Sequence, residues 1–196
     1  MTYGKCFVLS FCIVLTIAAC LGCGDGTTCD EKLASSLSDD IINEGASNVN
    51  HSLLRVDSAE EAGVFTAAYA NITKARIFAN ADQRSMAAYF AEKVIAAETE
   101  HPITTPTDSD FYCTARWILA DVAYANGEYG KSLALAKEIL AFVGDGASPK
   151  DVAMRCSALS QMAECESELN HIDEAERLFG APRNVQALIM RTSIIG

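Results

Sequence analysis

The stretch from Ala115 to Leu140 constrains the fold of this chain more than any other. Its apolar residues recur at helical spacing, Asn126-Gly127 interrupts them, and a second series with the same spacing follows. The pattern predicts two helices joined by a tight turn. Neither helix is long enough to be stable alone in water, so each is expected to bury its apolar stripe against its partner and then against another hairpin.

A related arrangement occurs three times along the chain. Each copy has a large residue followed by an alanine, then a turn, then a small residue early in a second helix. The copies are Lys74-Ala75, Asp82-Gln83-Arg84 and Ala87; Leu119-Ala120, Gly127-Glu128-Tyr129 and Ser132; and Met162-Ala163, Asn170-His171-Ile172 and Ala175. The pattern resembles the tetratricopeptide repeat, whose hairpins pack small residues across a turn and are about 34 residues long. Longer connections, HPITTPTDSD and GDGASP, separate the copies here.

The resemblance implies an all-α fold, in which antiparallel helix hairpins stack as a right-handed solenoid, and it brings no catalytic residues with it. The scarcity of strand signals favours the same fold class, since no segment sustains a two-residue alternation of Val, Ile and Thr. A helical domain is expected over 58–196, with a last helix that covers the open side of the final hairpin. The expected hairpins span about 58–100, 108–143 and 148–180, and the capping helix spans 183–195.

Two features predict how the helical domain begins. Ser58-Ala59-Glu60-Glu61 has the spacing of a capping box, so a long helix is expected to start there and to continue to about Asn80. Segment 23–57 precedes it and has the small, polar start of a tether. Within that segment, apolar residues recur every four positions from Leu33 to Ile41, which predicts a short amphipathic helix that ends at Gly45.

Residues 1–22 have the pattern of a signal peptide, with an apolar run from Cys6 to Leu21 after one basic residue. The run is short for an uncleaved membrane anchor, which needs about 20 apolar residues. Its end, Ile17-Ala18-Ala19-Cys20, resembles the lipobox of bacterial lipoproteins. That resemblance implies cleavage before Cys20, with Cys23 as the alternative, and acylation of the new N-terminal cysteine. We therefore expect a lipid-anchored protein of the cell envelope; the alternative is an ordinary signal and a secreted protein.

The charge of the chain limits the partners that it can bind. Its formal net charge is −11 at pH 7, which disfavours nucleic acid and anionic lipid headgroups because each phosphate contact needs a compensating Lys or Arg. Such a surface favours a basic protein partner. The competing interpretation is that the acidic residues serve solubility alone.

The eight cysteines do not form a metal-binding pattern. Those of the expected helical domain, Cys113, Cys156 and Cys165, are dispersed and lack the close pairs of a zinc site, so no metal is predicted. They are expected to be buried thiols. The alternative is a disulfide between Cys113 and Cys156, which align at the same position of adjacent hairpins, or one between Cys23 and Cys29.

Catalytic chemistry finds little support in the sequence. The chain has no GxSxG motif, no phosphate-binding glycine loop and no HExxH motif, so neither a catalytic residue nor a cofactor is predicted. The most suggestive pair, Glu164 and Glu168, lies one helical turn apart and has the spacing for general acid and base roles. A solvated acidic face is the simpler interpretation of the same pair.

The expected function is that of a non-enzymatic scaffold or adaptor that binds a protein partner. If the hairpins align as described, Tyr112, Arg116 and Tyr124, together with Asn71, are exposed on the first helices and contact that partner. One alternative is an immunity or inhibitor lipoprotein that blocks a basic toxin. The alternative from another class is a periplasmic hydrolase or transglycosylase that uses one Glu on a helical scaffold.

Overall fold

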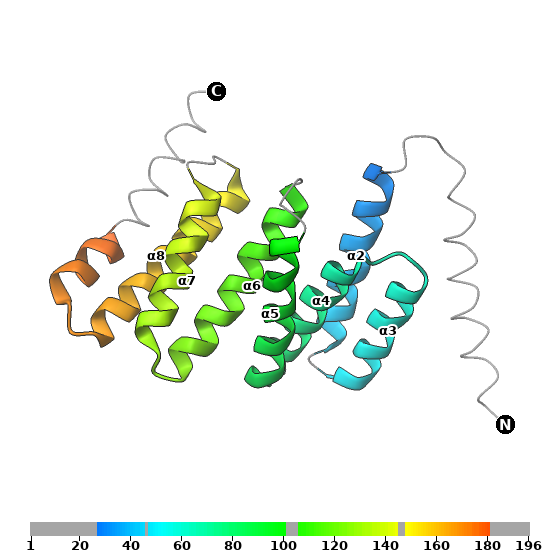
Figure 1. Cartoon of the computed structure of the whole chain (residues 1–196), viewed down its shortest axis with the longest axis horizontal. Helices are drawn as coiled ribbons and strands as arrows, with labels where there is room; N and C mark the ends of the chain where they lie inside the picture. The colour runs from blue at the N-terminus through cyan, green and yellow to red at the C-terminus, as the bar shows by residue number, and fades with distance from the viewer. Residues whose placement is uncertain (1–26, 46, 101–105, 145–147, 181–196) are drawn as a thin grey trace.

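A computed structural model of the chain describes residues 27–45, 47–100, 106–144 and 148–180 (Figure 1). Every regular element within these ranges is helical, which confirms the predicted all-α fold. The helices are α2 (Thr27–Gly45), α3 (Val49–Glu61), α4 (Ala67–Asn80), α5 (Arg84–Glu100), α6 (Pro106–Ala125), α7 (Tyr129–Val143) and α8 (Pro149–Glu168), followed by helical residues 172–180.

Neighbouring helices pack in succession along the long axis of the molecule (Figure 1). The hairpins are α2–α3, α4–α5, α6–α7 and α8 with residues 172–180. We call the leading members α2, α4, α6 and α8 the first helices, and the others the second helices. Packing continues from one hairpin to the next, because α5 contacts α6 and α7 contacts α8; α4 also contacts both α2 and α6. The first helices α2, α4 and α6 therefore form one layer of the stack.

Three of the hairpins share one turn geometry, at the three places that the sequence predicts. Asp82, Gly127 and Asn170 each adopt a left-handed backbone conformation, with φ of 54°, 77° and 62°. The next residue donates its backbone N–H to a carbonyl five positions earlier, as in the Schellman motif that ends many helices. These bonds run from Gln83 to Phe78 at 2.9 Å, from Glu128 to Ala123 at 2.8 Å and from His171 to Glu166 at 2.8 Å.

The small residues on either side of these turns are buried, as the sequence predicts. The alanine of each first helix has no exposed surface, and the small residue of each second helix is at most 4% exposed. Side chains of this size let the two helix axes approach closely. The first-helix residues are Ala75, Ala120 and Ala163, and their second-helix counterparts are Ala87, Ser132 and Ala175.

The predicted long helix from Ser58 to about Asn80 is wrong. Ser58 lies inside α3, which ends at Glu61, and α4 begins only at Ala67. Gly63 ends the first of these helices because it adopts a left-handed conformation, with φ of 71°. The second helix has its own cap, since the Thr66 hydroxyl accepts the backbone N–H of Tyr69 at 3.2 Å. The chain therefore makes an additional turn within the expected first hairpin.

Segment 23–57 contributes more to the stack than a tether would. The predicted amphipathic helix is present as α2 and ends at Gly45, as expected. It packs against α3 and α4, burying Ile41 and Ile42, and the Ser38 hydroxyl lies 2.9 Å from that of Thr73. The next helix, α3, already starts at Val49. The expected domain boundary at 57/58 thus falls inside a helix.

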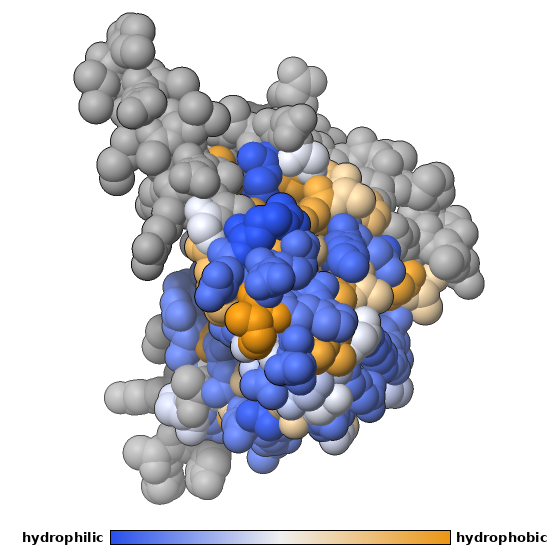
Figure 2. Space-filling view, turned by 90° about the vertical axis from the view of Figure 1, so that its left-hand side faces the viewer, coloured by the Kyte–Doolittle hydropathy of each residue, from blue (hydrophilic) through white to orange (hydrophobic). Residues whose placement is uncertain are grey.

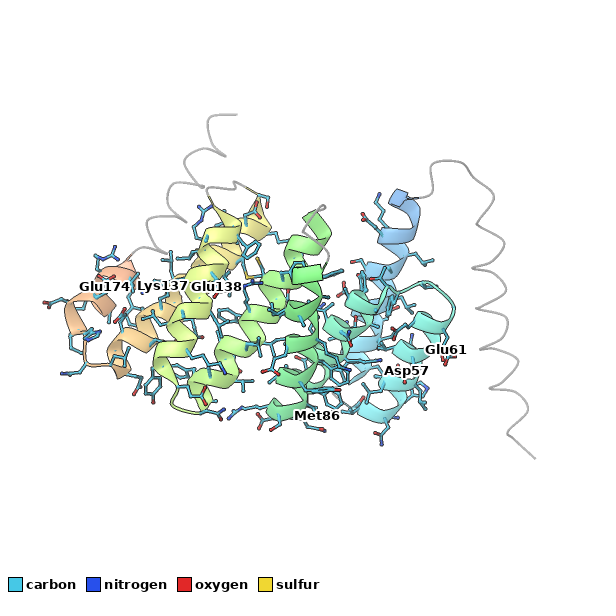
Figure 3. The ribbon with its side chains drawn as sticks, viewed as in Figure 1. Asp57, Glu61, Met86, Lys137, Glu138 and Glu174 are labelled. Carbon is cyan, nitrogen blue, oxygen red and sulfur yellow. The ribbon has the colours of Figure 1, made fainter. Side chains whose placement is uncertain are left out.

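The core consists of apolar clusters that follow one another along the stack. The largest described cluster joins α4, α5 and α6 around Phe78, Val94 and Ile118. Met86 of α5 lies outside this core and is 40% exposed (Figure 3). Ala87 and Ala91 of the same helix are buried in the core.

Two predicted segments lie outside the described residues, namely the signal peptide over 1–22 and the capping helix over 183–195. Among the helices that are described, none is both long enough and apolar enough to cross a membrane.

Candidate functional site

The structure buries two of the four residues expected to contact a partner. Tyr112 is 5% exposed and belongs to the core cluster of α4, α5 and α6. Arg116 is buried against α7, where its Nε donates to the Glu138 carboxylate at 2.8 Å and its guanidinium lies 4.6 Å from the centre of the Phe142 ring. Their expected exposure is wrong, because this side of α6 faces neighbouring helices rather than solvent. A binding role for these two residues is not carried further.

The other two expected contact residues are half-buried, Asn71 in α4 and Tyr124 near the end of α6. The ring of Tyr124 meets that of Tyr129 edge to face, with centres 5.4 Å apart. Burial, followed by the nearby carboxylates of Glu168 and Glu164, raises the pKa of the Tyr124 hydroxyl above its ordinary value of 10. Tyr124 therefore lies near α8, and its role in binding stays a prediction.

The first helices present polar side chains directly after their buried alanines. Arg76, Asp121 and Glu164 occupy this position on α4, α6 and α8. Glu168 follows Glu164 after one helical turn and therefore lies on the same side of α8. We call Asp121, Glu164 and Glu168 the acidic stripe. All three are exposed, and none has an ion-pair partner among the described residues.

A cleft of about 270 Å³ lies between α4 and α6, beside the acidic stripe. One wall comes from α4 and the start of α5, and the other comes from α6. Small and apolar side chains line much of it, together with charged groups. Its lining residues are Arg76, Ala79, Asn80, Asp82, Arg84, Ala87, Thr114, Trp117, Ile118, Asp121 and Val122.

The charges in this cleft are unequally compensated. Arg76 has Asp39 of α2 as a partner, with Nη1 and Oδ1 3.6 Å apart. Arg84 has Asp82 as a partner, with Nε and Oδ1 3.2 Å apart. The carboxylate of Asp121 forms no ion pair with any described residue. An incoming cation would therefore meet an uncompensated negative charge on the α6 wall.

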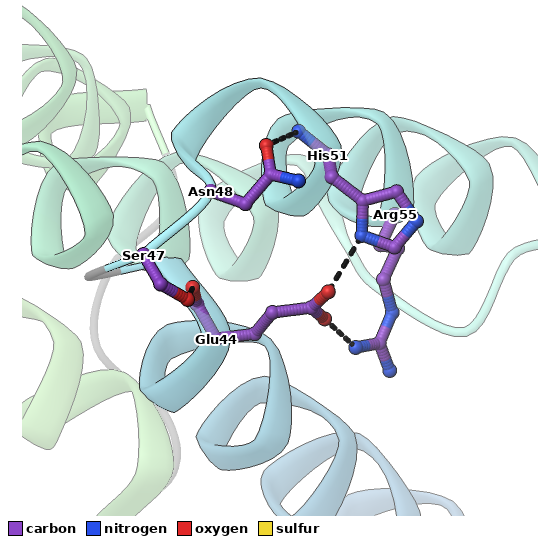
Figure 4. Close-up of polar contacts among 5 residues, drawn as sticks. All are labelled: Glu44, Ser47, Asn48, His51 and Arg55. Carbon is purple, nitrogen blue, oxygen red and sulfur yellow. Dashed lines mark hydrogen bonds and ion pairs between the residues drawn. The ribbon is translucent and has the colours of Figure 1, made fainter.

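A second polar cluster joins the end of α2 to the start of α3 (Figure 4). The Glu44 carboxylate contacts His51 Nδ1 at 2.7 Å and accepts from Arg55 Nη1 at 2.5 Å. Asn48 caps α3 by accepting the backbone N–H of His51 at 3.3 Å. The hydrogen bond from Arg55 holds the pKa of Glu44 below its ordinary value. Because each group is engaged with the others across the turn, the cluster fastens the two helices together.

The buried carboxylate of α8 also has a structural partner. Glu166 is 8% exposed, and its Oε2 lies 2.6 Å from Nδ1 of His171 in the following turn. This pair does not line the cleft, and it is not part of the acidic stripe. No group of three or more potential metal ligands occurs in the described part of the chain.

Cys113 and Cys165 are buried, and Cys156 is half-buried. Cys113 packs with Ile139 and Ala158 in a small core cluster, and Cys165 has no exposed surface. The alternative disulfide between Cys113 and Cys156 stays a prediction. The lipidation candidates Cys20 and Cys23, like Cys29, fall outside the residues whose side chains are described.

The end of the stack formed by the last hairpin is mostly hydrophilic, with scattered apolar side chains (Figure 2). The exposed apolar residues of this hairpin are Leu169, Ile172 and Phe179. Exposed apolar side chains in such small numbers are common on protein surfaces.

Comparison with protein families, curated proteins and solved structures found no match for this chain. The function of the cleft and of the acidic stripe is therefore inferred from their geometry and charge. The sequence pattern indicated Glu164 and Glu168 as a pair but did not indicate Asp121. The available signal was the repeat itself, because Asp121 follows Ala120 as Glu164 follows Ala163.

Proposed function

We propose that this protein is a non-enzymatic scaffold that binds a basic segment of a protein partner across its first helices. The observation that carries the proposal is the acidic stripe on α6 and α8, which forms no ion pair with a described residue and adjoins the cleft through Asp121. Uncompensated carboxylates raise the local concentration of cationic ligands and accelerate their association.

The way the hairpins are built supports a binding role. Buried small residues and a repeated turn fix the helices relative to one another. A partner therefore meets a preorganised surface, and less entropy is lost on binding than with a flexible chain. The same two features support the resemblance to tetratricopeptide repeats, which we retain as part of the proposal.

The alternative enzymatic function has weaker support. Glu164 and Glu168 are exposed, whereas a general acid with a raised pKa is usually desolvated. Glu166 is the buried member of the same helix, but His171 engages it and it lies outside the cleft. An inhibitor of a basic toxin would use the same acidic stripe, so the binding proposal includes that alternative.

We further propose that a lipid on Cys20, or on Cys23, holds the scaffold in the cell envelope. The support is the lipobox-like sequence at the end of the apolar run. The test is the intact mass of the protein from its native host, with Cys20→Ser and Cys23→Ser measured separately. Acyl mass that disappears with one substitution would support the anchor, and an unmodified soluble protein would refute it.

The binding proposal is tested by fluorescence anisotropy of labelled peptides with equal length and opposite charge. The full-length chain should bind the basic peptide, more weakly as salt rises, and should not bind the acidic one. A triple variant, D121N/E164Q/E168Q, should lose most of this binding.

The matched control removes three exposed carboxyls from second helices, Glu61→Gln, Glu92→Gln and Glu176→Gln. It makes the same change in net charge but leaves the acidic stripe intact. Equal losses in the two triple variants would mean that net charge alone attracts the peptide, and the proposed face would be wrong.

A further inference from the structure

The cleft between α4 and α6 combines the features that select an arginine side chain. Trp117 is half-buried and lines the α6 wall one helical turn before Asp121, so the indole and the carboxylate lie on the same side of the helix. A guanidinium can donate two hydrogen bonds to a carboxylate while its plane stacks on an aromatic face. Trp is also the aromatic side chain that attracts cations best.

The size of the cleft suits one side chain. Sites for small-molecule ligands commonly measure about 300–1,000 Å³, and this cleft, at about 270 Å³, falls just below that range. Its apolar lining, which includes Ala79, Ile118 and Val122, can receive the methylene groups of a long side chain.

The charges of the cleft also favour a cation over an anion. Asp39 and Asp82 already neutralise the two arginines of the cleft, Arg76 and Arg84. The α6 wall carries the carboxylate of Asp121, which is uncompensated within the described residues. An anionic ligand would have to displace existing ion pairs, whereas a cationic ligand would form a new one.

We propose that this cleft receives an arginine side chain of the partner, with its guanidinium on the carboxylate of Asp121 and against the indole of Trp117. The inference rests on the proposed function, because it assumes that a basic segment lies across the first helices. It adds the residue type that is recognised and the position at which it docks.

Trp117 is the only tryptophan of the chain, so its fluorescence reports directly on the cleft. The experiment titrates the full-length chain with three synthetic peptides of one length, which carry arginine, lysine or glutamate at the same positions in a Gly/Ser background. Peptide anisotropy is measured in parallel. The arginine peptide should change the Trp117 emission and should bind more tightly than the lysine peptide.

The variant Asp121→Asn removes the charge from an exposed side chain that forms no ion pair with a described residue, so folding should be unaffected. It should weaken binding of the arginine peptide by about tenfold or more, as expected for a lost charge-assisted hydrogen bond. The control Glu92→Gln removes a carboxyl from α5, outside the cleft, and should leave the affinity within about twofold of wild type.

The other outcomes separate the two proposals. If the arginine peptide binds without a change in Trp117 emission, or equally well to D121N, the cleft inference is overturned and the proposed function stands. If no peptide binds, or if the glutamate peptide binds best and loses affinity in R76Q and R84Q, both are overturned.

Discussion

The α4–α5 hairpin and the last hairpin have the same turn but carry different side chains beside it. In the first, Phe78 stacks on Phe90 with ring centres 5.6 Å apart and planes 7° from parallel. At the position of Phe78 the last hairpin has Glu166, whose carboxylate contacts His171. The α6–α7 hairpin has only Ala123 there. The turn and its small residues therefore determine the backbone, while the residue whose backbone carbonyl accepts the turn hydrogen bond can carry different side chains.

Removal of an aromatic side chain should give the largest difference in stability between variants of these two hairpins. Phe78 is 6% exposed, and Phe78→Ala should lower the free energy of unfolding by about 3–5 kcal/mol, because it leaves a cavity in the core. Phe179→Ala, in the last hairpin, should cost less than about 1 kcal/mol, since that ring is 48% exposed. Urea denaturation measures both. Equal costs would show that the two hairpins are packed alike.

Substitution of Arg116 tests whether the stability of the α6–α7 hairpin depends on a polar interaction in its interior. Arg116→Ala should destabilise the protein by about 1–3 kcal/mol, through the loss of packing on Phe142 and of the bond to Glu138. Glu138 is half exposed, so Glu138→Gln should cost less than about 1 kcal/mol. Because α8 has Leu159 at the equivalent position, Arg116→Leu should recover part of the loss. An R116A variant as stable as wild type would contradict a structural role.

The shared turn can be tested by exchanging its left-handed residue. Gly127→Ala should cost about 1–2 kcal/mol from backbone strain alone, because a Cβ at this position would have no atom within 4 Å. Asn170→Gly should be neutral or stabilise by up to about 1 kcal/mol, since glycine adopts this conformation without strain. Thermal unfolding measures both changes. We expect Gly127→Ala to lower the melting temperature and Asn170→Gly to leave it unchanged or raise it. If both substitutions lowered the melting temperature, the two turns would not be equivalent.

The smallest expected effect is an acid sensitivity of the α2–α3 turn. Arg55 and His51 lower the pKa of Glu44 in the folded protein. A depressed carboxyl pKa contributes stability that is present above the unfolded value and is lost as pH falls through the folded one. The stability advantage of wild type over Glu44→Gln should therefore shrink as pH falls below about 4.5. Glu92→Gln, which breaks no described ion pair, should not show this dependence.

Much of the backbone could be predicted because its signals are local. Asp82, Gly127 and Asn170 stand at the turns of three repeated patterns, and the small residues beside them tolerate close helix contacts. The extra turn before α4 was missed because Ser58 and Glu61 imitate a capping box. The effective signals were Gly63, which readily adopts a left-handed conformation, and Thr66, which caps the next helix.

The binding surface was harder to predict, because exposure depends on neighbouring helices. Tyr112 and Arg116 were expected at the surface of α6, but α6 turns them toward other helices, and Arg116 reaches Glu138 across the hairpin. Asp121 belongs to no local motif, and its one signal was its position in the repeat, directly after Ala120. Its importance arises only when α4 and α6 together form a cleft.

Hydrogen exchange of the full-length chain, with and without an arginine-rich peptide, tests most directly where a partner binds. The proposal predicts slower exchange in fragments of α4, α6 and α8 when the peptide is present, and unchanged exchange in α7 and residues 172–180. Protection confined to the second helices would contradict the assignment of the binding face, and so would the absence of any protection at saturating peptide.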